Sequence, residues 1–235
     1  RVSNAIIENN TIIMEINNSY DEYCDGETIS IRGTVLRNNT IYSCNYRTIN
    51  VTAYSDFDDI IEDNIIYFNK FGIQISGSSN FSEFLLSGNL LLTSESSNYA
   101  IQIERSGNII NNTILAKENG AGTAIYIYDD NFNNINISNN IVYGYEYAIN
   151  NNSNRDIVVS YNNFDNISSA EFALGTLPSY FGEYNYTNQN GIAIDLYNNM
   201  SSDPLFVDIE NDNYQIMFDS PCVDAGDPNI MDING

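Results

Sequence analysis

Ile110-Asn111-Asn112-Thr113-Ile114 occurs in seven related versions along the 235-residue chain. Each version has an apolar residue, a short polar step that ends in asparagine, and a second apolar residue. The final asparagines stand at positions 10, 39, 64, 89, 112, 140 and 163, which are 29, 25, 25, 23, 28 and 23 residues apart. Self-similarity at this period predicts a solenoid, in which each repeat forms one coil that stacks on the next.

A second pattern lies earlier in each repeat, where apolar and polar residues alternate, as in Ile29-Ser30-Ile31. Period two with β-branched side chains indicates short strands. Each coil is therefore expected to contain a strand, a turn, a second strand, a tight asparagine turn and a third strand. Asparagine suits the tight turn because it tolerates the left-handed backbone conformation. Stacked asparagines can also hydrogen-bond along a ladder.

These patterns predict an all-β fold, namely a single right-handed parallel β-helix of about seven or eight coils. A leucine-rich repeat has a similar length but needs helical segments, and the connectors at 120–123 and 150–153 are poor in helix formers. We expect one domain. It comprises β-helix coils over 1–169, a projecting aromatic-rich loop over 170–190, and a last coil with a C-terminal closing segment over 191–235.

Stacking makes a specific prediction for three charged residues. Glu8, Arg37 and Glu62 each stand two residues before a ladder asparagine in successive repeats. Arg37 should therefore lie between two carboxylates and relieve their repulsion. Exposed pairs of this kind contribute about 0–1 kcal/mol each, so we expect a structural role.

The segment 170–190 interrupts the repeat and is rich in aromatic residues. Loops on rigid scaffolds often carry binding residues. We predict a binding surface at Tyr180, Phe181, Tyr184 and Tyr186. The alternative is a flap that packs on the side or the end of the rod.

The charge of the chain limits its partners. Eight basic residues stand against 31 acidic ones, and the formal net charge is −23. Nucleic-acid-binding proteins need a basic face, so no nucleic-acid partner is expected, and anionic membrane surfaces are also disfavoured. No apolar segment is long enough for membrane insertion. The chain has no histidine, which excludes Ser–His and Cys–His nucleophile machinery.

The many carboxylate oxygens favour Ca²⁺ as the cation that neutralises the negative charge of the chain. The alternative is that the charge serves only solubility. Asp58 and Glu83 each stand six residues before a ladder asparagine, so stacking should bring them about 5 Å apart. Together with Asp59 they form the first candidate calcium site. The second candidate site comprises Asp224, Asp227 and Asp232.

The three cysteines are Cys24, Cys44 and Cys222, and none forms a CxxC pair, which argues against zinc. Cys24 and Cys44 lie in neighbouring repeats, where they can form a disulfide. A disulfide would fit an exported protein. Buried free thiols are the alternative.

The C-terminal part contains DPLFVD at 203–208 and SPCVDAGD at 220–227. With the repeat, this ending resembles the right-handed parallel β-helix proteins of the pectate-lyase-like superfamily, over nearly the whole chain. The resemblance implies an extracellular or cell-surface location and a closing segment that covers the last coil. The family includes polysaccharide lyases, glycoside hydrolases, epimerases, adhesins and surface-layer parts, so the fold does not select one function.

The leading functional hypothesis is a non-enzymatic structural or adhesive component of a cell surface or filament. The repeat begins at Val2 without an evident helical cap. We therefore expect another piece or a partner to cover this end. End-to-end self-assembly by strand addition, or contact with other surface proteins, would provide such a partner.

The alternative hypothesis is a carbohydrate-active protein. A calcium-dependent polysaccharide lyase would use Arg105 as its base, but the basic residues are few and scattered, which disfavours an acidic polymer as substrate. A carbohydrate-binding module would use tyrosines to stack on sugar rings. The tyrosines that cluster across one coil serve this purpose or shield the strands in ladders: Tyr126, Tyr128, Tyr143, Tyr145 and Tyr147.

Overall fold

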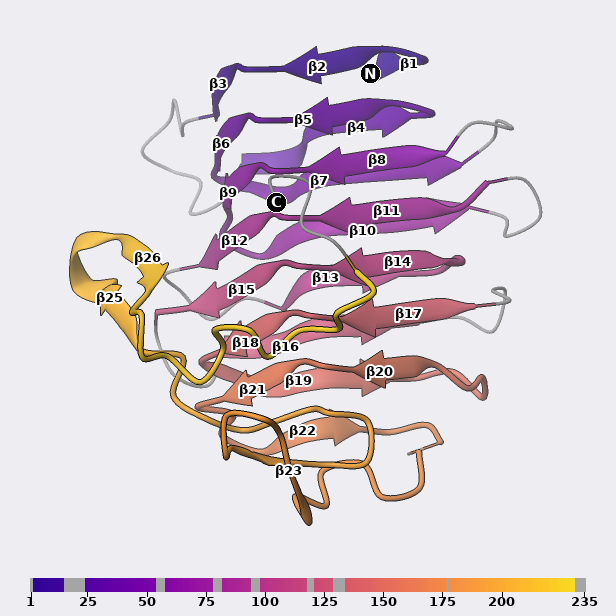
Figure 1. The fold of residues 1–235 in the computed structure, drawn as a ribbon. Helices are drawn as coiled ribbons and strands as arrows, with labels where there is room; N and C mark the ends of the chain where they lie inside the picture. The colour runs from indigo at the N-terminus through magenta and orange to yellow at the C-terminus, as the bar shows by residue number, and fades with distance from the viewer. Residues whose placement is uncertain are drawn as a thin grey trace.

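Consecutive short strands of the chain belong in turn to three parallel sheets, and this order repeats in every coil (Figure 1). The computed structural model describes residues 2–14, 24–53, 58–77, 82–93, 98–117, 121–128, 134–176 and 178–230. Successive strands of one sheet come from successive repeats and pair in parallel. The predicted all-β fold, a single parallel β-solenoid of stacked coils, is confirmed.

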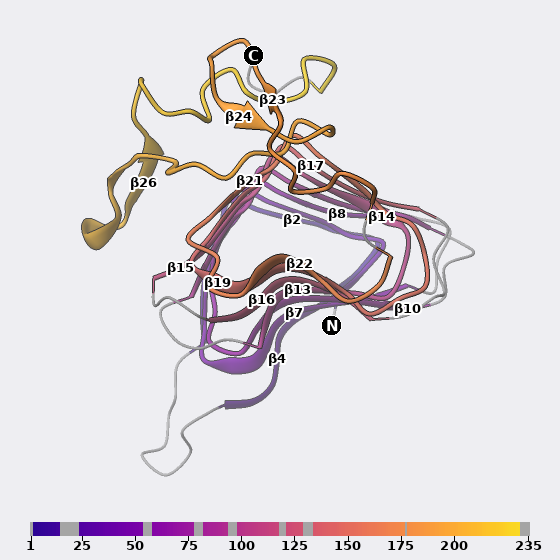
Figure 2. The ribbon, with the colours of Figure 1, turned by 90° about the horizontal axis from the view of Figure 1, so that it is seen from below.

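The three sheets hold eight, seven and seven strands among the described residues, and we name them sheets A, B and C. Viewed along the solenoid axis they enclose a three-sided section (Figure 2). Sheet A contains β1 (Val2–Ser3), β4 (Cys24–Arg32), β7 (Asn45–Ala53), β10 (Phe71–Gly77), β13 (Tyr99–Ile103), β16 (Ala121–Ile127), β19 (Tyr145–Asn151) and β22 (Ala170–Ala173). Sheet B contains β2 (Ile6–Glu8), β5 (Val35–Arg37), β8 (Asp59–Glu62), β11 (Phe84–Ser87), β14 (Gly107–Ile110), β17 (Ile135–Ser138) and β20 (Val158–Ser160). Sheet C contains β3 (Thr11–Met14), β6 (Thr40–Ser43), β9 (Ile65–Tyr67), β12 (Leu90–Thr93), β15 (Thr113–Ala116), β18 (Ile141–Tyr143) and β21 (Asn163–Asp165).

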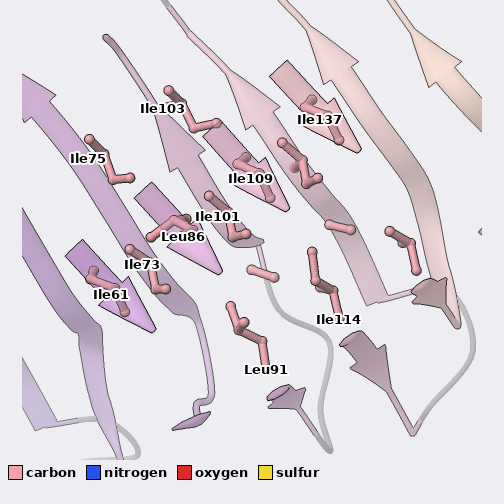
Figure 3. Packing of buried hydrophobic residues seen from close by; sticks show 14 of the residues in the cluster. Ile61, Ile73, Ile75, Leu86, Leu91, Ile101, Ile103, Ile109, Ile114 and Ile137 are labelled. Carbon is pink, nitrogen blue, oxygen red and sulfur yellow. The ribbon is translucent and has the colours of Figure 1, made fainter. Parts of the chain in front are cut away.

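The core consists of columns of aliphatic side chains that stack in register from coil to coil. Figure 3 shows this packing in the middle of the molecule, where strands of different sheets face one another. Burying each such side chain stabilises the fold by roughly 1.5–3 kcal/mol. The column of sheet A contains residues that are at most 1% exposed: Ile49, Ile73, Ile101, Ile125 and Ile149.

The turn between sheets B and C assigns two different roles to two successive residues. The first residue has a positive φ, as at Asn38 (53°), Asn111 (57°) and Asn139 (57°). The left-handed conformation is tolerated best by glycine and asparagine, and the other turns have mostly these residues or aspartate. The second residue is the ladder asparagine, whose side chain points into the solenoid and is buried, as at Asn39 and Asn112.

The ladder is continuous and its hydrogen bonds are satisfied. The backbone N–H and the Nδ2 of Asn89 both donate to Oδ1 of Asn112 at 3.0 Å, and Asn112 donates in the same way to Asn140. The Nδ2 of Asn89 also donates to the carbonyl oxygen of Ile61 in the preceding coil. Since the bonds from each ladder asparagine to the next all run toward the C-terminus, the ladder needs an acceptor at its C-terminal end.

The structure corrects the predicted ladder at one position and extends it by another. Asn162, not Asn163, accepts from Asn140, and Tyr161 takes the positive-φ position before it. Asn163 instead bonds to the closing segment, because its Nδ2 donates to the carbonyl oxygen of Ser202. The sequence suggested Asn163 because two adjacent asparagines looked like a complete turn.

Asn199 is an additional rung that the repeat spacing did not indicate. Both the backbone N–H and the Nδ2 of Asn162 donate to its Oδ1 at 3.0 Å. Asn199 follows Asn198, which has a positive φ of 63°, so the local pattern is present. An insertion of residues between the two last turns made the step too long to recognise.

Residues 178–200 lie at the C-terminal end of the stack, at the bottom of Figure 1, and Figure 2 shows that they follow the edge of the last coil. The segment predicted as a projecting loop begins as β22, the last strand of sheet A. Phe181 is buried and packs against Phe164 and Phe172, with ring centroids 6.1 and 5.3 Å away. β23 (Tyr186–Thr187) and β24 (Ala193–Ile194) then form a short antiparallel pair. The segment is therefore the packed flap that the sequence left open as an alternative.

The closing segment lies largely along the side of the solenoid. β25 (Phe206–Asp208), the 3-10 turn η1 (Ile209–Asn211) and β26 (Asn213–Ile216) form a hairpin beside sheet C (Figures 1 and 2). The chain then runs back along the asparagine turns, where the backbone N–H of Asp227 donates to Oδ1 of Asn139. The segment contacts the last coil at Asn163, but residues 178–200, and not the closing segment, lie at the end of the stack. The expectation from the family resemblance is thus met only in part.

Candidate functional site

The predicted charge stack at the first coils is confirmed and is structural. Arg37 Nε donates to Glu8 Oε2 at 2.6 Å, and Arg37 Nη1 lies 3.9 Å from Glu62 Oε1. The hydrogen bond to Glu8 raises the pKa of Arg37. The stack links three coils on the outer face of sheet B, where the side chains of Glu8 and Arg37 are about 40% exposed and that of Glu62 is 17% exposed.

Asp58 and Glu83 lie next to each other in neighbouring coils, as stacking predicted. Asp58 Oδ1 accepts a hydrogen bond from the backbone N–H of Glu83 at 2.9 Å, and both residues are exposed. Asp59 points the other way, because strand residues alternate between the two faces. It is 1% exposed and therefore separate from the other two carboxylates.

Asp59 is the counter-ion of Arg105 inside the solenoid. Arg105 Nη2 lies 2.6 Å from Asp59 Oδ2, Arg105 Nη1 donates to Ser82 Oγ at 3.2 Å, and neither charged side chain is more than 1% exposed. Thr34 also donates its backbone N–H to Asp59 Oδ1. Since the guanidinium is enclosed and paired, Arg105 cannot reach a polymer on the surface, and its predicted role as a base is wrong.

The second candidate calcium site is spread over the returning tail. Asp224 is exposed, and Asp227 accepts from the backbone N–H and Nδ2 of Asn229. Asp232 lies outside the described residues. No three His, Cys, Asp or Glu side chains in the described part of the chain gather closely enough to hold a metal ion. Calcium binding stays a prediction.

The four predicted binding residues of the end segment fall into different environments. Tyr180 and Tyr186 are exposed, at 58% and 50%. Phe181 is instead part of the core cluster. Tyr184 donates its hydroxyl to Glu171 Oε2 at 2.5 Å, and burial, followed by this bond, raises the pKa of Tyr184. Only Tyr180 and Tyr186 thus face solvent.

The cysteines also occupy different environments. Cys44 is disulfide-bonded, and the side chain of Cys24 lies outside the described atoms. Cys222 is a free thiol, whose Sγ accepts from Asn163 Nδ2 at 3.4 Å. Burial raises the pKa of Cys222 to about 11, so the thiol is protonated and unreactive at neutral pH.

The tyrosines that the sequence placed in one cluster separate onto different faces. Tyr145 is fully buried, Tyr143 packs edge-on against Phe206 of the hairpin, and Tyr126 and Tyr128 lie on the outer face of sheet A. The last pair belongs to an aromatic row along the solenoid axis. Successive ring centroids in this row are 4.7, 5.4, 4.3 and 6.0 Å apart: Tyr46, Phe71, Tyr99, Tyr126 and Tyr128.

Polar side chains lie in register beside this aromatic row. Asn50, Gln74, Gln102, Tyr126 and Asn150 occupy one cross-strand column of sheet A, each half-buried on the outer face. The column thus holds four amide side chains and one tyrosine, Tyr126, which also belongs to the aromatic row. The sequence indicated the individual residues, but only the register between coils shows that they form one surface.

Several hollows flank the closing segment in the described part of the chain, and two of them are larger than the rest. A groove of about 920 Å³ lies between the asparagine turns and the returning tail, and Asn111, Tyr161 and Asp227 are among its lining residues. A cleft of about 740 Å³ lies between sheet C and the β25–β26 hairpin, and is lined by Tyr42, Tyr67 and other residues. Neither hollow was predicted, because the position of the closing segment depends on tertiary contacts.

No protein-family model, no curated protein and no solved structure matches this chain. Within the described residues, no helix has the length and apolar character needed to cross a membrane.

Proposed function

We propose that this chain is a non-enzymatic structural or adhesive component of a cell surface or filament. The observation that supports it is the asparagine ladder, which runs unbroken from Asn10 to Asn199 beside in-register columns of aliphatic side chains. Each coil is bonded to the next at the same position. Such a stack forms a stiff rod, which suits a spacer or scaffold.

The proposed location is extracellular. Cys44 is disulfide-bonded, and disulfides persist mainly in oxidising compartments. The DPLFVD and SPCVDAGD segments support the same location through their resemblance to exported members of the pectate-lyase-like superfamily, and membership of that superfamily is part of this proposal.

The lyase alternative is weakened by the burial of Arg105. A lyase needs an exposed base beside its metal site, and the guanidinium is enclosed with Asp59 as its partner. The acidic surface would also repel a polyuronate. We therefore do not assign an elimination reaction to this chain.

The proposed assembly runs end to end, with Ca²⁺ at the contacts between surfaces. Residues 178–200 lie at the C-terminal end of the stack, so a contact there would use the outer surface of this segment, which includes Tyr180 and Tyr186. Calcium would bridge exposed carboxylates of neighbouring molecules. Asp58 and Glu83 lie on the side of the rod, next to β8 and β11, so calcium there would join rods that lie side by side.

Electron microscopy of the native protein in Ca²⁺, and again after chelation, tests this proposal. Ordered filaments or sheets that dissolve on chelation would support assembly with metal at the contacts. A double variant, Asp58→Asn with Glu83→Gln, should then weaken assembly. Discrete rods under both conditions would contradict the assembly role.

The second candidate function is carbohydrate binding on sheet A. It is favoured by Tyr99 and Tyr126, whose rings stack at 4.3 Å with an interplanar angle of 10°, beside the amide column. Affinity electrophoresis with neutral and acidic polysaccharides tests it. Retardation by a polysaccharide should disappear in Tyr126→Ala and persist in the control Tyr186→Ala, whose ring is exposed at the end of the stack.

A further inference from the structure

The cleft between sheet C and the hairpin has an apolar floor. Tyr42 and Tyr67 lie in neighbouring coils with ring centroids 4.6 Å apart and an interplanar angle of 6°. Ile13, which pairs with Tyr42, is 57% exposed at the open end, and Met14 is 41% exposed beside it. Leu92, which pairs with Tyr67, is buried at the closed end.

Polar groups lie where the hairpin meets the solenoid, with Asp212 and Tyr214 from the hairpin and Lys117 from the end of β15. Lys117 Nζ lies 2.6 Å from Asp212 Oδ1, and the hydroxyl of Tyr214 donates to the same oxygen at 2.6 Å. Lys117 also lies 6.0 Å from the centroid of the Tyr214 ring. The hydrogen bond from Lys117 lowers the pKa of Asp212, so the carboxylate is ionised at neutral pH.

These groups have no net charge together, since one ammonium pairs with one carboxylate. They offer both donors and acceptors, because Asp212 Oδ2 and the hydroxyl oxygen of Tyr214 can accept, while Lys117 has further N–H groups to donate. A ligand that suits them is uncharged and carries several hydroxyls. The chain's net charge of −23 further disfavours an anionic ligand.

The volume of about 740 Å³ lies within the range of small-molecule sites, which combine apolar walls with a few fixed polar groups. A pyranose ring has this dual character, with an apolar C–H face and a rim of hydroxyls. Its C–H face would pack on Tyr42, which is 40% exposed, and its hydroxyls would reach the Lys117–Asp212 pair.

We propose that the cleft between sheet C and the β25–β26 hairpin is a binding site for a neutral pyranoside, such as the end or a short stretch of an uncharged oligosaccharide. The inference does not depend on the structural role proposed above, because it holds equally for a spacer and for an adhesin. It also differs from the candidate surface on sheet A, which lies on another face of the solenoid.

Saturation-transfer NMR with cellotetraose, mannotetraose, tetra-N-acetylchitotetraose and tetragalacturonate tests the site on the whole chain. At least one of the three neutral tetrasaccharides should receive saturation, and tetragalacturonate should bind at least tenfold more weakly. Binding is then quantified by tyrosine fluorescence, which is unobscured because the chain has no tryptophan.

Two variants and one control locate the binding. Tyr42→Ala and Lys117→Met should each raise the Kd of the neutral tetrasaccharide about tenfold or more. Phe218→Ala removes an aromatic ring that is 93% exposed and lies outside the cleft lining, and it should leave the Kd within twofold. Thermal unfolding monitored by circular dichroism checks that each variant is folded, and Lys117→Met preserves the test if Tyr42→Ala does not fold.

Three outcomes would overturn the proposal. The first is no saturation transfer to any neutral tetrasaccharide. The second is binding that Tyr126→Ala abolishes and the cleft variants retain, which would place the site on sheet A. The third concerns an apolar fluorescent dye whose binding is weakened by Tyr42→Ala and which therefore occupies the cleft. If none of the sugars displaces this dye, the cleft is an apolar docking surface and not a sugar site.

Discussion

At the residue scale, the turn between sheets B and C explains the asparagine-rich composition. One position needs a residue that tolerates positive φ, and the next needs a side chain that both donates and accepts in the ladder. Asparagine meets both needs, and a β-branched residue can then begin the strand, as in Asn38-Asn39-Thr40. The N-x-Thr sequences at three of these turns, 9–11, 38–40 and 111–113, are therefore compatible with the geometry of the coil.

Tyr161 is the exception at the positive-φ position, with φ of 57°. A residue with a bulky side chain loses roughly 1–2 kcal/mol there compared with its preferred conformations, and asparagine loses less. We expect Tyr161→Asn to raise the free energy of unfolding by about 1 kcal/mol, measured by urea denaturation. The reverse change Asn38→Tyr should lower it by a similar amount. A decrease for Tyr161→Asn, or no decrease for Asn38→Tyr, would contradict this explanation.

The ladder makes a second prediction at this scale. Asn112→Ala would leave the backbone N–H and the Nδ2 of Asn89 without their acceptor inside the solenoid. Each unsatisfied buried donor costs about 1–3 kcal/mol, so the free energy of unfolding should fall by about 3 kcal/mol. The control Asn108→Ala, on the outer face of sheet B, should change it by less than about 0.5 kcal/mol. Equal effects in urea denaturation would refute a special role for the ladder.

At the element scale, the segment at the C-terminal end of the stack combines apolar and ionisable contacts. Phe181 packs into the core cluster, and Gly182 donates its backbone N–H to Asp195 Oδ2 at 3.1 Å. Glu171 on β22 accepts from the Tyr184 hydroxyl, which ties the flap to the last strand of sheet A. The flap is therefore attached through a few partly buried polar groups as well as through its aromatic rings.

Glu171 should make the stability of this element depend on pH. Burial raises the pKa of Glu171 in the folded state above its ordinary value of 4.5. The folded state then binds more protons than the unfolded state, so this contribution is fully present below pH 4.5 and is lost as the pH rises through the raised value. Glu171→Gln removes this ionisation. The free energy of unfolding of the variant, minus that of wild type, should therefore be larger at pH 7 than at pH 4. Urea denaturation at both values checks this, and a pH-independent difference would contradict it.

At the scale of the whole molecule, the solenoid is nearly one-dimensional, because each coil contacts mainly its two neighbours. The groups at its two ends therefore need hydrogen-bond partners that are not supplied by a neighbouring coil. Asp195 provides the acceptor that the ladder needs, since it accepts from the backbone N–H and Nδ2 of Asn199 and is 1% exposed. Its carboxylate also accepts from the backbone N–H groups of Tyr197 and Gly182.

Asp195→Ala should loosen only the C-terminal end of the stack. Hydrogen exchange followed by mass spectrometry should show faster exchange in residues 178–200 and in β20 and β21. Exchange in β7 to β15 should stay unchanged, because those coils keep both neighbours. A uniform increase along the whole chain would show instead that the solenoid unfolds as one cooperative unit.

Particular residues show how far the sequence could be interpreted. The ladder positions from Asn10 to Asn140, the strands of three sheets and the Glu8–Arg37–Glu62 stack follow from spacing alone, because coils of similar length stack in register. Asp59 and Asp58 look equivalent in sequence, but the alternation of the strand sends one inward to Arg105 and leaves the other in solvent. Phe181 and Tyr180 separate in the same way at the C-terminal end of the stack.

The sequence by itself determined the parallel solenoid, the asparagine turns and the acidic surface of this protein, because these features are local and repeat with every coil. Only the tertiary structure decided the path of the segment after Asn163. That segment occurs once, so no periodicity constrains it, and its position depends on non-local contacts such as Tyr143 with Phe206 and Lys117 with Asp212. The groove and the cleft beside it exist for the same reason, since each has one wall from the repeat and the other from the returning chain.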